Sequence, residues 1–443
     1  MDLPNSMPTL QNLDVSACGV SIDTRTLQEG NIYFALKREK DGHDYIAEAI
    51  KNGASILVVD HPVQSHVPEI VVPDTLKALG ELAHFWRMQF SIPIIALTGS
   101  CGKTTTKEMI AAILREKGEV LASEGNFNNA YGLPLMLLRL RAHHRFAVLE
   151  MGTNSPGEIA YIADIAQPTV ALITNIGASH LEKLSSFEGV SNEKSAIFNA
   201  LPDSGIAIVN QDEPFAASWQ DKIARRQRVT YGSAPSAEVS AQHVHFNKQG
   251  VHFDLKTPLG IQPVAVPLIG RHMLMNALAA AATAMSVGAS PADIAHGLSK
   301  VLPIDGRFKP ITLENGCLII DDAYNASVTA VKNAIDTLAH FKGMRIFVMS
   351  NMGELGDQAQ HYHEEMGRWC HDAHFDHVFF FGDKTLLDFA LSHCPRAHYF
   401  EKKSDLIATL KPLRLPHTMI LIKGANSNAM DEVVNALTDE APR

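Results

Sequence analysis

A nine-residue segment, T-G-S-C-G-K-T-T-T at positions 98–106, constrains the fold of this chain more than any other. An apolar run at 94–97 precedes it, and an amphipathic run at 107–114 follows it. A strand, a glycine-containing turn and a helix form the setting that a phosphate cradle requires. Gly99 and Gly102 let the backbone approach phosphate oxygens, and the N–H groups of the first helical turn point at the anion. The segment therefore predicts a nucleotide-phosphate site.

Two side chains of this segment suit nucleotide chemistry. Lys103 supplies a point charge for the outer phosphates, and the Thr104 hydroxyl is placed to ligate Mg²⁺. The match to G-x-x-x-x-G-K-[ST] is imperfect, because Leu97 occupies the position of the first glycine. The alternative is an ordinary strand-to-helix turn with a chance lysine. Cys101 lies at a helix N-terminus, which can lower the pKa of a thiol, but the loop needs only a small residue there and we expect no chemical role.

The length and composition of the chain limit the kind of protein that contains this loop. The 443 residues predict about three domains, and 46% apolar with 19% charged residues is typical of a globular protein. The formal net charge of −10 argues against a broad nucleic-acid-binding surface. The most apolar stretch, at 277–287, is short and alanine-rich, and it predicts a buried helix rather than a membrane span.

The cysteines and the first residues indicate a compartment. Five scattered cysteines without a C-x-x-C pair favour reduced thiols in a cytoplasm over a disulfide framework. The N-terminal M-D-L-P lacks a basic region followed by an apolar core, so we expect no signal peptide. We therefore expect a cytoplasmic protein without membrane insertion.

Short apolar runs alternate with helical segments along the whole chain. The expected strands lie at 54–59, 70–72, 94–97, 147–149, 170–174, 206–209, 318–320, 345–349, 378–381 and 419–422. This alternation predicts mostly parallel sheets that are covered by helices on both faces. Between about 228 and 268, apolar and polar residues alternate on either side of 247–250, which predicts a β-hairpin.

Two glycine- or proline-containing joints, at 89–93 and 305–310, divide the chain into three α/β domains. We expect an N-terminal domain at 1–92, a central domain at 93–309 and a C-terminal domain at 310–443. The central domain would be a P-loop mononucleotide-binding domain with a doubly wound, mostly parallel sheet and a β-rich portion. The C-terminal domain would be Rossmann-like.

Three polar residues beyond the loop suit a metal site. Glu150 ends the strand at 147–149, and an acidic residue at the carboxyl end of a strand beside a phosphate loop is a natural Mg²⁺ ligand. His180 follows the next strand, and Lys194 lies in a predicted helix. Taken singly, a lone histidine is more often a hydrogen-bonded structural residue, and a lone helical lysine is usually an exposed charge.

Residues suited to nucleotide contacts recur farther along. Asn276 can cap a helix, face solvent or bind a nucleobase edge with its paired donor and acceptor. Arg307 suits a phosphate or ribose as well as a surface ion pair. Asp321 and Asp322 follow a buried strand, at the mouth where open α/β sheets bind ligands.

The order of these motifs resembles the Mur ligase family over essentially the whole chain. The strings are T-G-S-C-G-K-T-T-T, E-M-G-T-N, T-N-I-G-A-S-H-L-E, E-K-S-A-I-F, G-R-H-M-L-M-N-A, D-G-R-F and D-D-A-Y-N-A. Five more are most similar to the branch of the family that adds D-alanyl-D-alanine. Four of them are S-I-D-T-R-T-L-Q-E-G-N-I-Y-F-A-L at 21–36, D-G-H-D-Y at 41–45, N-F-N-N-A-Y-G-L-P-L-M-L-L-R-L at 126–140, and N-M-G-E-L-G at 351–356 with Y-H-E-E at 362–365. The last string, L-I-K-G-A-N-S at 421–427, occupies the terminal segment of the family as a whole.

The resemblance implies an ATP-dependent amide-bond ligase of bacterial peptidoglycan synthesis, and thus a part in cell-wall biogenesis, cell shape and cell division. ATP would activate the terminal carboxylate of a UDP-MurNAc-tripeptide as an acyl phosphate, and the amine of D-Ala-D-Ala would attack it. The product would be UDP-MurNAc-pentapeptide, with meso-diaminopimelate or lysine at the third position. The three domains would bind the UDP-substrate, ATP and the incoming dipeptide in chain order, within a monomer.

The resemblance also implies roles for individual residues. ATP would be held by Gly99, Ser100, Cys101, Gly102, Lys103, Thr104, Thr105, Asn276, Arg307, Asp322 and Tyr324. Two Mg²⁺ ions would be held by Thr104, Glu150, His180 and Lys194, the lysine as a carbamate that offers oxygen ligands. Lys103, Lys194 and His180 would be catalytic. The UDP-linked substrate would be contacted by Thr24, Arg25, His43, Asp44, Tyr45, Asn126, Asn128, Asn129 and Asn325.

The chain departs from the family pattern in its C-terminal third. Ala323 stands where a Thr or Ser is expected before Tyr324, and no Pro follows the Asn-Ala unit that begins at Asn325. Asn426 stands where an arginine is common. These departures lie in the region expected to meet the dipeptide or the ATP phosphates.

Three alternatives stay open from the residues. The first is another amide ligase, either an amino-acid-adding Mur ligase for diaminopimelate or lysine, or a folylpolyglutamate synthase. The second is a P-loop switch or regulatory nucleotide-binding module, and the third is a noncatalytic ligase-like scaffold. The histidines at 361, 363, 371, 374 and 377 resemble a metal cluster by number, but their spacing fits no metal motif and we expect helical surface residues.

Overall fold

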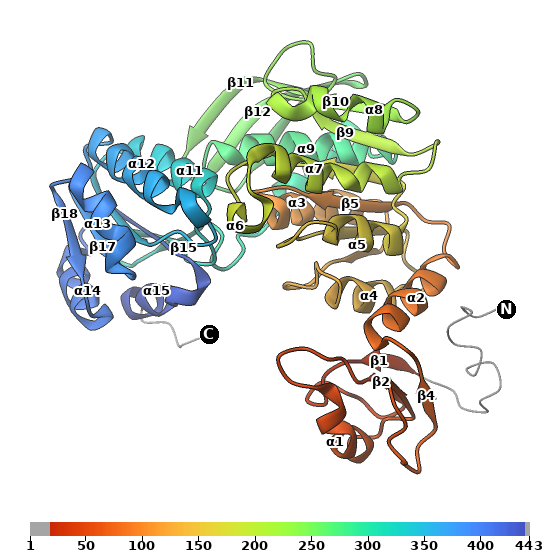
Figure 1. The fold of residues 1–443 in the computed structure, drawn as a ribbon. Coiled ribbons are helices and arrows are strands. Elements are labelled where there is room, and N and C mark those ends of the chain that lie inside the picture. The colour runs from red at the N-terminus through yellow and green to blue at the C-terminus, as the bar shows by residue number, and fades with distance from the viewer. Residues whose placement is uncertain (1–17, 439–443) are drawn as a thin grey trace.

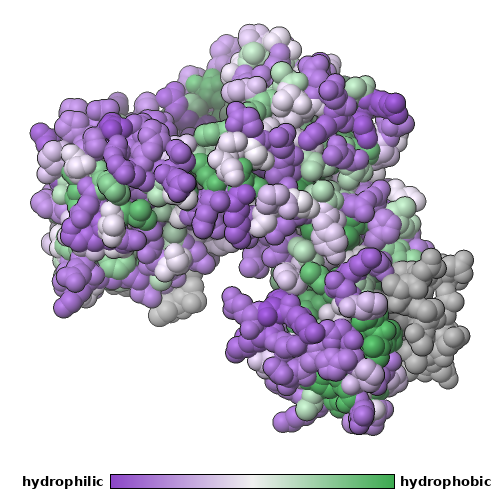
Figure 2. Space-filling model, in the orientation of Figure 1, coloured by the Kyte–Doolittle hydropathy of each residue, from purple (hydrophilic) through white to green (hydrophobic). Residues whose placement is uncertain are grey.

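The computed structural model describes residues 18–438 as three lobes in chain order (Figure 1). The N-terminal lobe contains strands β1 to β4, the central lobe β5 to β13, and the C-terminal lobe β14 to β19. Both outer lobes adjoin the central lobe. In the orientation of Figure 1, the surface is mostly hydrophilic (Figure 2). The N-terminal M-D-L-P lies outside the described residues.

The N-terminal lobe is built on four short parallel strands in sequence order. Its elements are β1 (Gly19–Ser21), β2 (Asn31–Phe34), α1 (Ile46–Lys51), β3 (Ile56–Val59), β4 (Glu69–Val71) and α2 (Thr75–Arg87). Strands β2 and β3 are buried at every position, as expected for a parallel sheet with both faces covered. The two strands expected here, at 54–59 and 70–72, are confirmed. Strands β1 and β2 were not predicted.

Helix α2 ties the N-terminal lobe to the central lobe. Its last residue, Arg87, is buried and donates hydrogen bonds to three carbonyls, those of Ala166 (2.7 Å), Gln167 (2.8 Å) and Phe90 (2.9 Å). The first two carbonyls end helix α5 (Glu158–Ala166) of the central lobe. A cation that satisfies terminal carbonyls stabilises a helix C-terminus, so Arg87 fastens the two lobes together.

The central lobe contains a six-stranded parallel sheet in the order β10-β9-β8-β5-β7-β6. Its strands are β5 (Ile94–Thr98), β6 (Val120–Ala122), β7 (Phe146–Glu150), β8 (Val170–Ile173), β9 (Ile206–Asn210) and β10 (Gln227–Tyr231). Its helices are α3 (Lys103–Arg115), α4 (Gly132–Leu137), α5, α6 (Leu181–Leu184), α7 (Phe187–Ser195), α8 (Gln220–Ile223), α9 (His272–Ser286) and α10 (Pro291–Ser299). The chain passes from β5 to β6 and β7 on one side and then crosses to β8 on the other. Such a reversal opens a crevice at the carboxyl ends of the strands, and the phosphate loop lies there, directly after β5.

A three-stranded antiparallel sheet forms the β-rich portion, with β11 (Ser240–Asn247), β12 (Gly250–Thr257) and β13 (Gly260–Val266). The expected hairpin is confirmed, since Asn247 lies opposite Gly250 at the turn. The expected helix at 277–287 is confirmed as the buried α9. Within residues 18–438, no helix combines the length and the apolar character that crossing a membrane requires.

The C-terminal lobe contains a six-stranded sheet in the order β14-β15-β19-β16-β17-β18, parallel except for β14. Its strands are β14 (Lys309–Thr312), β15 (Leu318–Asp322), β16 (Met344–Ser350), β17 (His377–Phe381), β18 (Ala397–Phe400) and β19 (Thr418–Lys423). Its helices are α11 (Val328–Ala339), α12 (Ala359–Asp372), α13 (Lys384–His393), α14 (Lys403–Leu410) and α15 (Asp431–Thr438). Because β19 inserts between β15 and β16, the strand ends Asp322, Lys423 and Ser350 lie at one edge of the sheet.

The expectation of surface histidines near α12 is wrong for His363. Its side chain is fully buried, its Nε2 accepts a hydrogen bond from the Met352 N–H (3.1 Å), and its Nδ1 donates to the Ala359 carbonyl (2.6 Å). His377 lies in strand β17 rather than in a helix. These positions follow from packing, which residue spacing does not reveal.

Candidate active site

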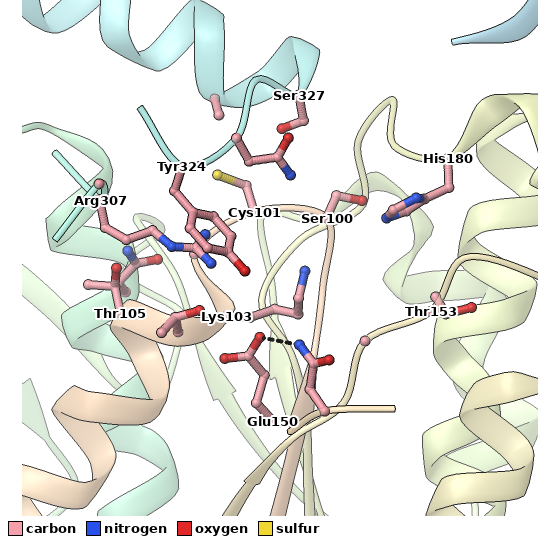
Figure 3. Close-up of a pocket in the computed structure, with 18 of the residues that line it drawn as sticks. Ser100, Cys101, Lys103, Thr105, Glu150, Thr153, His180, Arg307, Tyr324 and Ser327 are labelled. Carbon is pink, nitrogen blue, oxygen red and sulfur yellow. Dashed lines mark hydrogen bonds between the residues drawn. The ribbon is translucent and has the colours of Figure 1, made fainter. Parts of the chain in front are cut away.

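A cavity of about 370 Å³ lies between the carboxyl ends of the central sheet and the C-terminal lobe (Figure 3). It is lined by residues 100–105, 128–131, 150, 152–154, 158, 180, 272, 273, 276, 306–308, 322, 324, 325, 327, 330, 333 and 423. These segments are far apart in the sequence and come from both lobes. The arrangement encloses a site rather than leaving an open groove.

The phosphate loop takes a conformation that requires glycine at two positions. Gly102 has φ +79°, and a Cβ there would lie 2.6 Å from the Asn276 Oδ1. A Cβ at Gly99 would lie 1.9 Å from the Thr174 Oγ1. Helix α3 begins directly after Gly102 without a side-chain cap, so its first N–H groups stay available for an anion.

The segment 174–179 braces this loop. The Cys101 N–H donates to the Asn175 Oδ1 (3.0 Å), and the Cys101 carbonyl accepts from the Thr174 hydroxyl (2.7 Å) and the Asn175 Nδ2 (3.0 Å). The Ser179 hydroxyl donates to the Ser100 hydroxyl (2.9 Å). Burial raises the pKa of the Cys101 thiol, so the helix N-terminus does not activate it, as expected from the sequence.

Lys103 points into the middle of the cavity (Figure 3). Its Nζ donates to the Gly99 carbonyl at 2.8 Å. Burial lowers the pKa of Lys103, and the nearby Glu150 carboxylate acts in the opposite direction. An anion bound in the cavity would accept the hydrogen bond that Lys103 here donates to the Gly99 carbonyl. Its negative charge would favour the charged form of the Lys103 amine.

Glu150 carries an unsatisfied carboxylate oxygen at the end of β7. The residue is 3% exposed, and its Oε1 accepts a hydrogen bond from the Asn128 Nδ2 at 3.0 Å. Its Oε2 is buried and has no hydrogen-bond partner among residues 18–438. A buried carboxylate oxygen of this kind is costly unless a cation or donor meets it, and the Thr104 hydroxyl lines the same cavity. The donor set fits a divalent cation with a preference for oxygen ligands.

His180 lies on the opposite side of the cavity, with its ring pointing toward Ser100 (Figure 3). Its Nδ1 is 2.6 Å from the Glu354 Oε2 of the C-terminal lobe. This hydrogen bond lowers the pKa of the Glu354 carboxyl. The ring is therefore held between the two lobes.

Lys194 does not line the cavity but is buried beside it in α7. It is 1% exposed. Burial lowers the pKa of Lys194 well below its usual range, and the Lys103 cation acts in the same direction. The neighbouring Glu193 anchors the helix, since its carboxylate accepts from the Ile159 N–H (2.8 Å) and the Gly157 N–H (2.6 Å). The burial that holds the Lys194 amine in place thus disfavours its charged form.

Residues of the C-terminal lobe and its joint cover the cavity from above. The Arg307 guanidinium lies 3.9 Å from the centre of the Tyr324 ring, a cation–π contact (Figure 3). Lys423 ends β19 and is 1% exposed, and its Nζ lies 2.7 Å from the Asp322 Oδ2. Asn325 supplies a carbonyl to the same ammonium at 2.8 Å. The region thus presents two cations to an anionic ligand.

A second cavity, of about 830 Å³, lies on the N-terminal lobe. It is lined by Ile22, Asp23, Thr24, Arg25, Tyr33, Leu36, Arg38, Glu39, Lys40, Gly42, Tyr45, Glu48 and Tyr131. Tyr131 comes from the central lobe and also lines the first cavity, so the two cavities meet at its side chain. The Arg38 guanidinium lies 5.4 Å from the centre of the Tyr131 ring.

The structure brings together most of the residues singled out from the sequence. The first cavity is lined by Ser100, Cys101, Gly102, Lys103, Thr104, Thr105, Asn128, Asn129, Glu150, His180, Asn276, Arg307, Asp322, Tyr324 and Asn325. Thr24, Arg25 and Tyr45 line the second cavity. Gly99, Asn126 and Lys194 line neither, although Gly99 accepts the Lys103 hydrogen bond.

His43 and Asp44 also line neither cavity. The His43 side chain is 7% exposed, and its Nδ1 donates to the Asp41 carboxylate at 2.6 Å. Its Nε2 accepts from the Asp60 N–H at 3.2 Å. Both ring nitrogens are therefore used within the N-terminal lobe, which places His43 behind the cavity wall rather than in it.

Sequence reasoning missed two residues of the site. Lys423 stands directly after the strand expected at 419–422. Because the carboxyl ends of parallel strands lie together at one edge of a sheet, its position could have been predicted. His272 lines the first cavity, and its buried Nδ1 has no partner among the described residues. Burial lowers the pKa of His272 to about 4, so the ring is neutral at pH 7. Nothing in its local sequence pattern signals this position.

Comparison with known proteins covers the whole chain. The family model described as "Mur ligase family, catalytic domain" matches residues 17–87, and "Mur ligase middle domain" matches 97–284. The model "Mur ligase, glutamate ligase domain" matches 306–426. The three matches follow one another in the order of the three lobes.

Individual relatives match over nearly their full length. The chain is 40% identical over 435 residues to the UDP-N-acetylmuramoyl-tripeptide–D-alanyl-D-alanine ligase of Escherichia coli K12, covering 97% of this chain and 96% of that protein. It is similar to a crystal structure of MurF from Acinetobacter baumannii, with a TM-score of 0.90, 34% identity and coverage of 95% and 93%. It is also similar to MurF ligase from Thermotoga maritima in complex with ADP, with a TM-score of 0.87, 26% identity and coverage of 97% and 99%.

Proposed function

The chain belongs to the Mur ligase family of ATP-dependent amide ligases, and we propose that it joins D-alanyl-D-alanine to UDP-MurNAc-tripeptide. The product is UDP-MurNAc-pentapeptide for peptidoglycan synthesis. One observation carries the proposal. A phosphate loop, an unsatisfied buried carboxylate oxygen, Arg307 of the 305–310 joint and Lys423 of the C-terminal lobe face one cavity, which meets a second cavity at Tyr131.

The reaction needs ATP because a carboxylate does not acylate an amine unaided at neutral pH. The terminal carboxylate of the tripeptide attacks the γ-phosphate and displaces ADP, and the resulting acyl phosphate is attacked by the amine of the dipeptide, which loses a proton as the amide forms. Phosphate then leaves from a tetrahedral intermediate. Lys103 neutralises the charge that develops on the phosphoryl oxygens, and the N–H groups at the start of α3 hold the phosphates.

The nucleotide would lie along the rest of the cavity wall. Asn276 borders the first cavity and a neighbouring hollow of about 200 Å³, a place where its amide can meet the edge of a base. Arg307, Tyr324 and Asp322 would meet the phosphate and ribose side from the C-terminal lobe. Closure of the lobes excludes water, which would otherwise hydrolyse the acyl phosphate.

Glu150, Thr104 and His180 would hold the magnesium ions. The unsatisfied Oε2 of Glu150 supports this assignment. Magnesium bound there supplies charge that stabilises the transferring phosphoryl group. Asn128 keeps the carboxylate in place by its hydrogen bond to the other oxygen.

Lys194 would act as a carbamate. Its burial and the lowered pKa of its amine support the proposal. The uncharged form of a lysine amine adds CO₂ and releases one proton to give a carbamate, which changes a donor into a pair of oxygen acceptors suited to a second Mg²⁺. The lysine in its unmodified form offers no such ligand.

The substrates would divide among the lobes in chain order. Residues 1–92 bind the UDP end through the second cavity, residues 93–309 bind ATP, and residues 310–443 bind the dipeptide. Thr24, Arg25 and Tyr45 line the UDP cavity, whereas His43 and Asp44 support its wall. Asn128, Asn129 and Asn325 would lie nearer the muramoyl peptide.

We further propose a monomer in the bacterial cytoplasm. The five cysteines are unpaired, which fits a reducing compartment. Hinges near Pro93 and Pro310 would close the lobes, and small-angle scattering without compaction on adding nucleotide and UDP-substrate would contradict this motion.

The test is phosphate release from ATP in the presence of the UDP-tripeptide and a panel of amines. D-Ala-D-Ala should trigger release, with the pentapeptide product seen by mass spectrometry. Release triggered instead by diaminopimelate, lysine or glutamate would favour another Mur ligase or a folylpolyglutamate synthase-like enzyme. Nucleotide binding without amine-dependent turnover would favour a regulatory module or a scaffold.

A further inference from the structure

A polar contact joins the central and C-terminal lobes at the edge of the active-site cavity. The His180 Nδ1 lies 2.6 Å from the Glu354 Oε2. The Glu182 N–H donates to the Glu354 carbonyl at 3.2 Å. His180 directly precedes α6, and Glu354 follows β16, so each residue comes from a loop at the carboxyl edge of its own sheet.

Both residues of this contact have an unusual backbone conformation. His180 has φ +55° and Glu354 has φ +60°, the left-handed region that side-chain-bearing residues seldom adopt. Such conformations cost free energy and persist where the surroundings or the function require them. Gly356 has φ +53°, and a Cβ there would lie 3.0 Å from the Glu182 Cα, so the glycine permits the close approach of the lobes.

The contact fixes which ring nitrogen of His180 is free. Because Nδ1 lies 2.6 Å from the Glu354 Oε2, Nε2 is the ring nitrogen left for the cavity, which the ring lines. Figure 3 shows the ring directed toward Ser100 and the phosphate loop. A carboxylate on one imidazole nitrogen fixes the tautomer and orientation of the ring and raises the basicity of the other nitrogen.

We propose that Glu354 is a positioning residue that presents the Nε2 of His180 to the catalytic divalent cation, so that the metal site is complete only when the C-terminal lobe is docked. This inference rests on the proposed function and on the metal role of His180 within it. By reciprocity, binding of the metal–nucleotide complex favours the docked arrangement to the same degree. The lobe that receives the amine would then also complete the site that activates the carboxylate.

A simpler reading is that Glu354 only helps to dock the lobes. Two other contacts across the same interface provide a matched control. The Arg271 Nη1 lies 3.1 Å from the His340 Nε2, and the Lys248 Nζ lies 5.2 Å from the centre of the Phe341 ring. None of these four residues lines the cavity. If docking alone matters, loss of His340 should act like loss of Glu354.

The variants should fold, because Glu354 has a side chain that is 58% exposed and an exposed ion pair adds little to stability. The experiment measures Mn²⁺ affinity by electron paramagnetic resonance on the full chain, with a non-hydrolysable ATP analogue present. The proteins are the wild type, Glu354→Ala, Glu354→Gln, His180→Ala, the double variant Glu354→Ala/His180→Ala, and His340→Ala.

We expect Glu354→Ala to weaken Mn²⁺ binding by about 10- to 100-fold, the usual loss for a partner of a metal ligand. Glu354→Gln should recover part of this loss, because its amide oxygen still accepts the Nδ1 hydrogen bond. His340→Ala should leave the affinity unchanged, and Glu354→Ala should add no further loss in the His180→Ala background.

Two results would overturn the inference. One is unchanged Mn²⁺ affinity in Glu354→Ala, and the other is the same loss from Glu354→Ala with and without His180. If the wild-type protein still ligates D-Ala-D-Ala in either case, the proposed function stands and the positioning role alone fails. A wild-type protein that binds no Mn²⁺–nucleotide complex would overturn both.

Discussion

The ion pair between Lys423 and Asp322 joins two neighbouring strand ends of the C-terminal lobe inside the cavity. Lys423 is 1% exposed, and its Nζ donates to the Asp322 Oδ2 (2.7 Å) and to the Asn325 carbonyl (2.8 Å). We predict that Lys423→Met destabilises the protein by about 3–5 kcal/mol, because it leaves the Asp322 carboxylate buried without its partner. Methionine fills much of the volume of the lysine stem, so the uncompensated charge dominates the loss.

The expected loss of folding free energy distinguishes the buried Lys423–Asp322 pair from the surface ion pairs of the same lobe. For a domain of this size, a loss of about 3–5 kcal/mol lowers the melting temperature by about 10–15 °C. Lys384 forms a pair with Asp388 at 2.5 Å, but its side chain is 59% exposed. Lys384→Met should therefore cost at most about 1 kcal/mol. The double variant Lys423→Met/Asp322→Asn removes both charges and should recover most of the loss, because replacing a whole buried pair is often nearly neutral.

The assay is urea unfolding of the wild type and the three variants by circular dichroism at pH 7, with the slope m compared between them. If m is unchanged and the urea midpoint is lower, the variant has lost stability without a change in the surface that unfolding exposes. A Lys423→Met variant no less stable than Lys384→Met would refute the reasoning. So would a double variant as unstable as Lys423→Met alone, since the buried Asp322 charge would then not be the cause.

Three further predictions concern the site. Lys103→Ala should lower kcat at least about 100-fold, because the cation that meets the developing phosphoryl charge is lost, and steady-state rates like those of the wild type would exclude the phosphate-loop assignment. Lys194→Ala should lose activity and regain part of it when a short carboxylic acid is added, because the acid restores an oxygen ligand; activity that is intact without the acid would exclude a carbamate. The pKa of His272 is about 4 in the folded protein against an ordinary value of 6.5, so the unfolded state binds a proton first as the pH falls. The wild type should therefore lose stability between about pH 6.5 and pH 4, and His272→Gln should lose less, in urea unfolding at pH 7 and pH 5; equal losses would contradict the assignment.

The order and type of the elements could be read from local patterns. The ten expected strands are all present in the sheets, because apolar runs of three to six residues between helical segments leave few other ways to bury them. The strands that were missed, such as β1, β6 and β18, are short or partly exposed, so their apolar signal is weak. The phosphate loop is contiguous in sequence, and its glycines carry its conformation.

The sequence by itself determined the fold class, the phosphate loop and the residue types of the site, since each depends on neighbours within a few positions of the chain. The tertiary structure decided which of those residues meet. It buried Lys194, placed His43 behind the wall of the second cavity, paired Lys423 with Asp322 and brought Glu354 to His180. These outcomes depend on desolvation and on the docking of separate lobes, and both are set by contacts between segments whose spacing in the sequence carries no record of their distance in space.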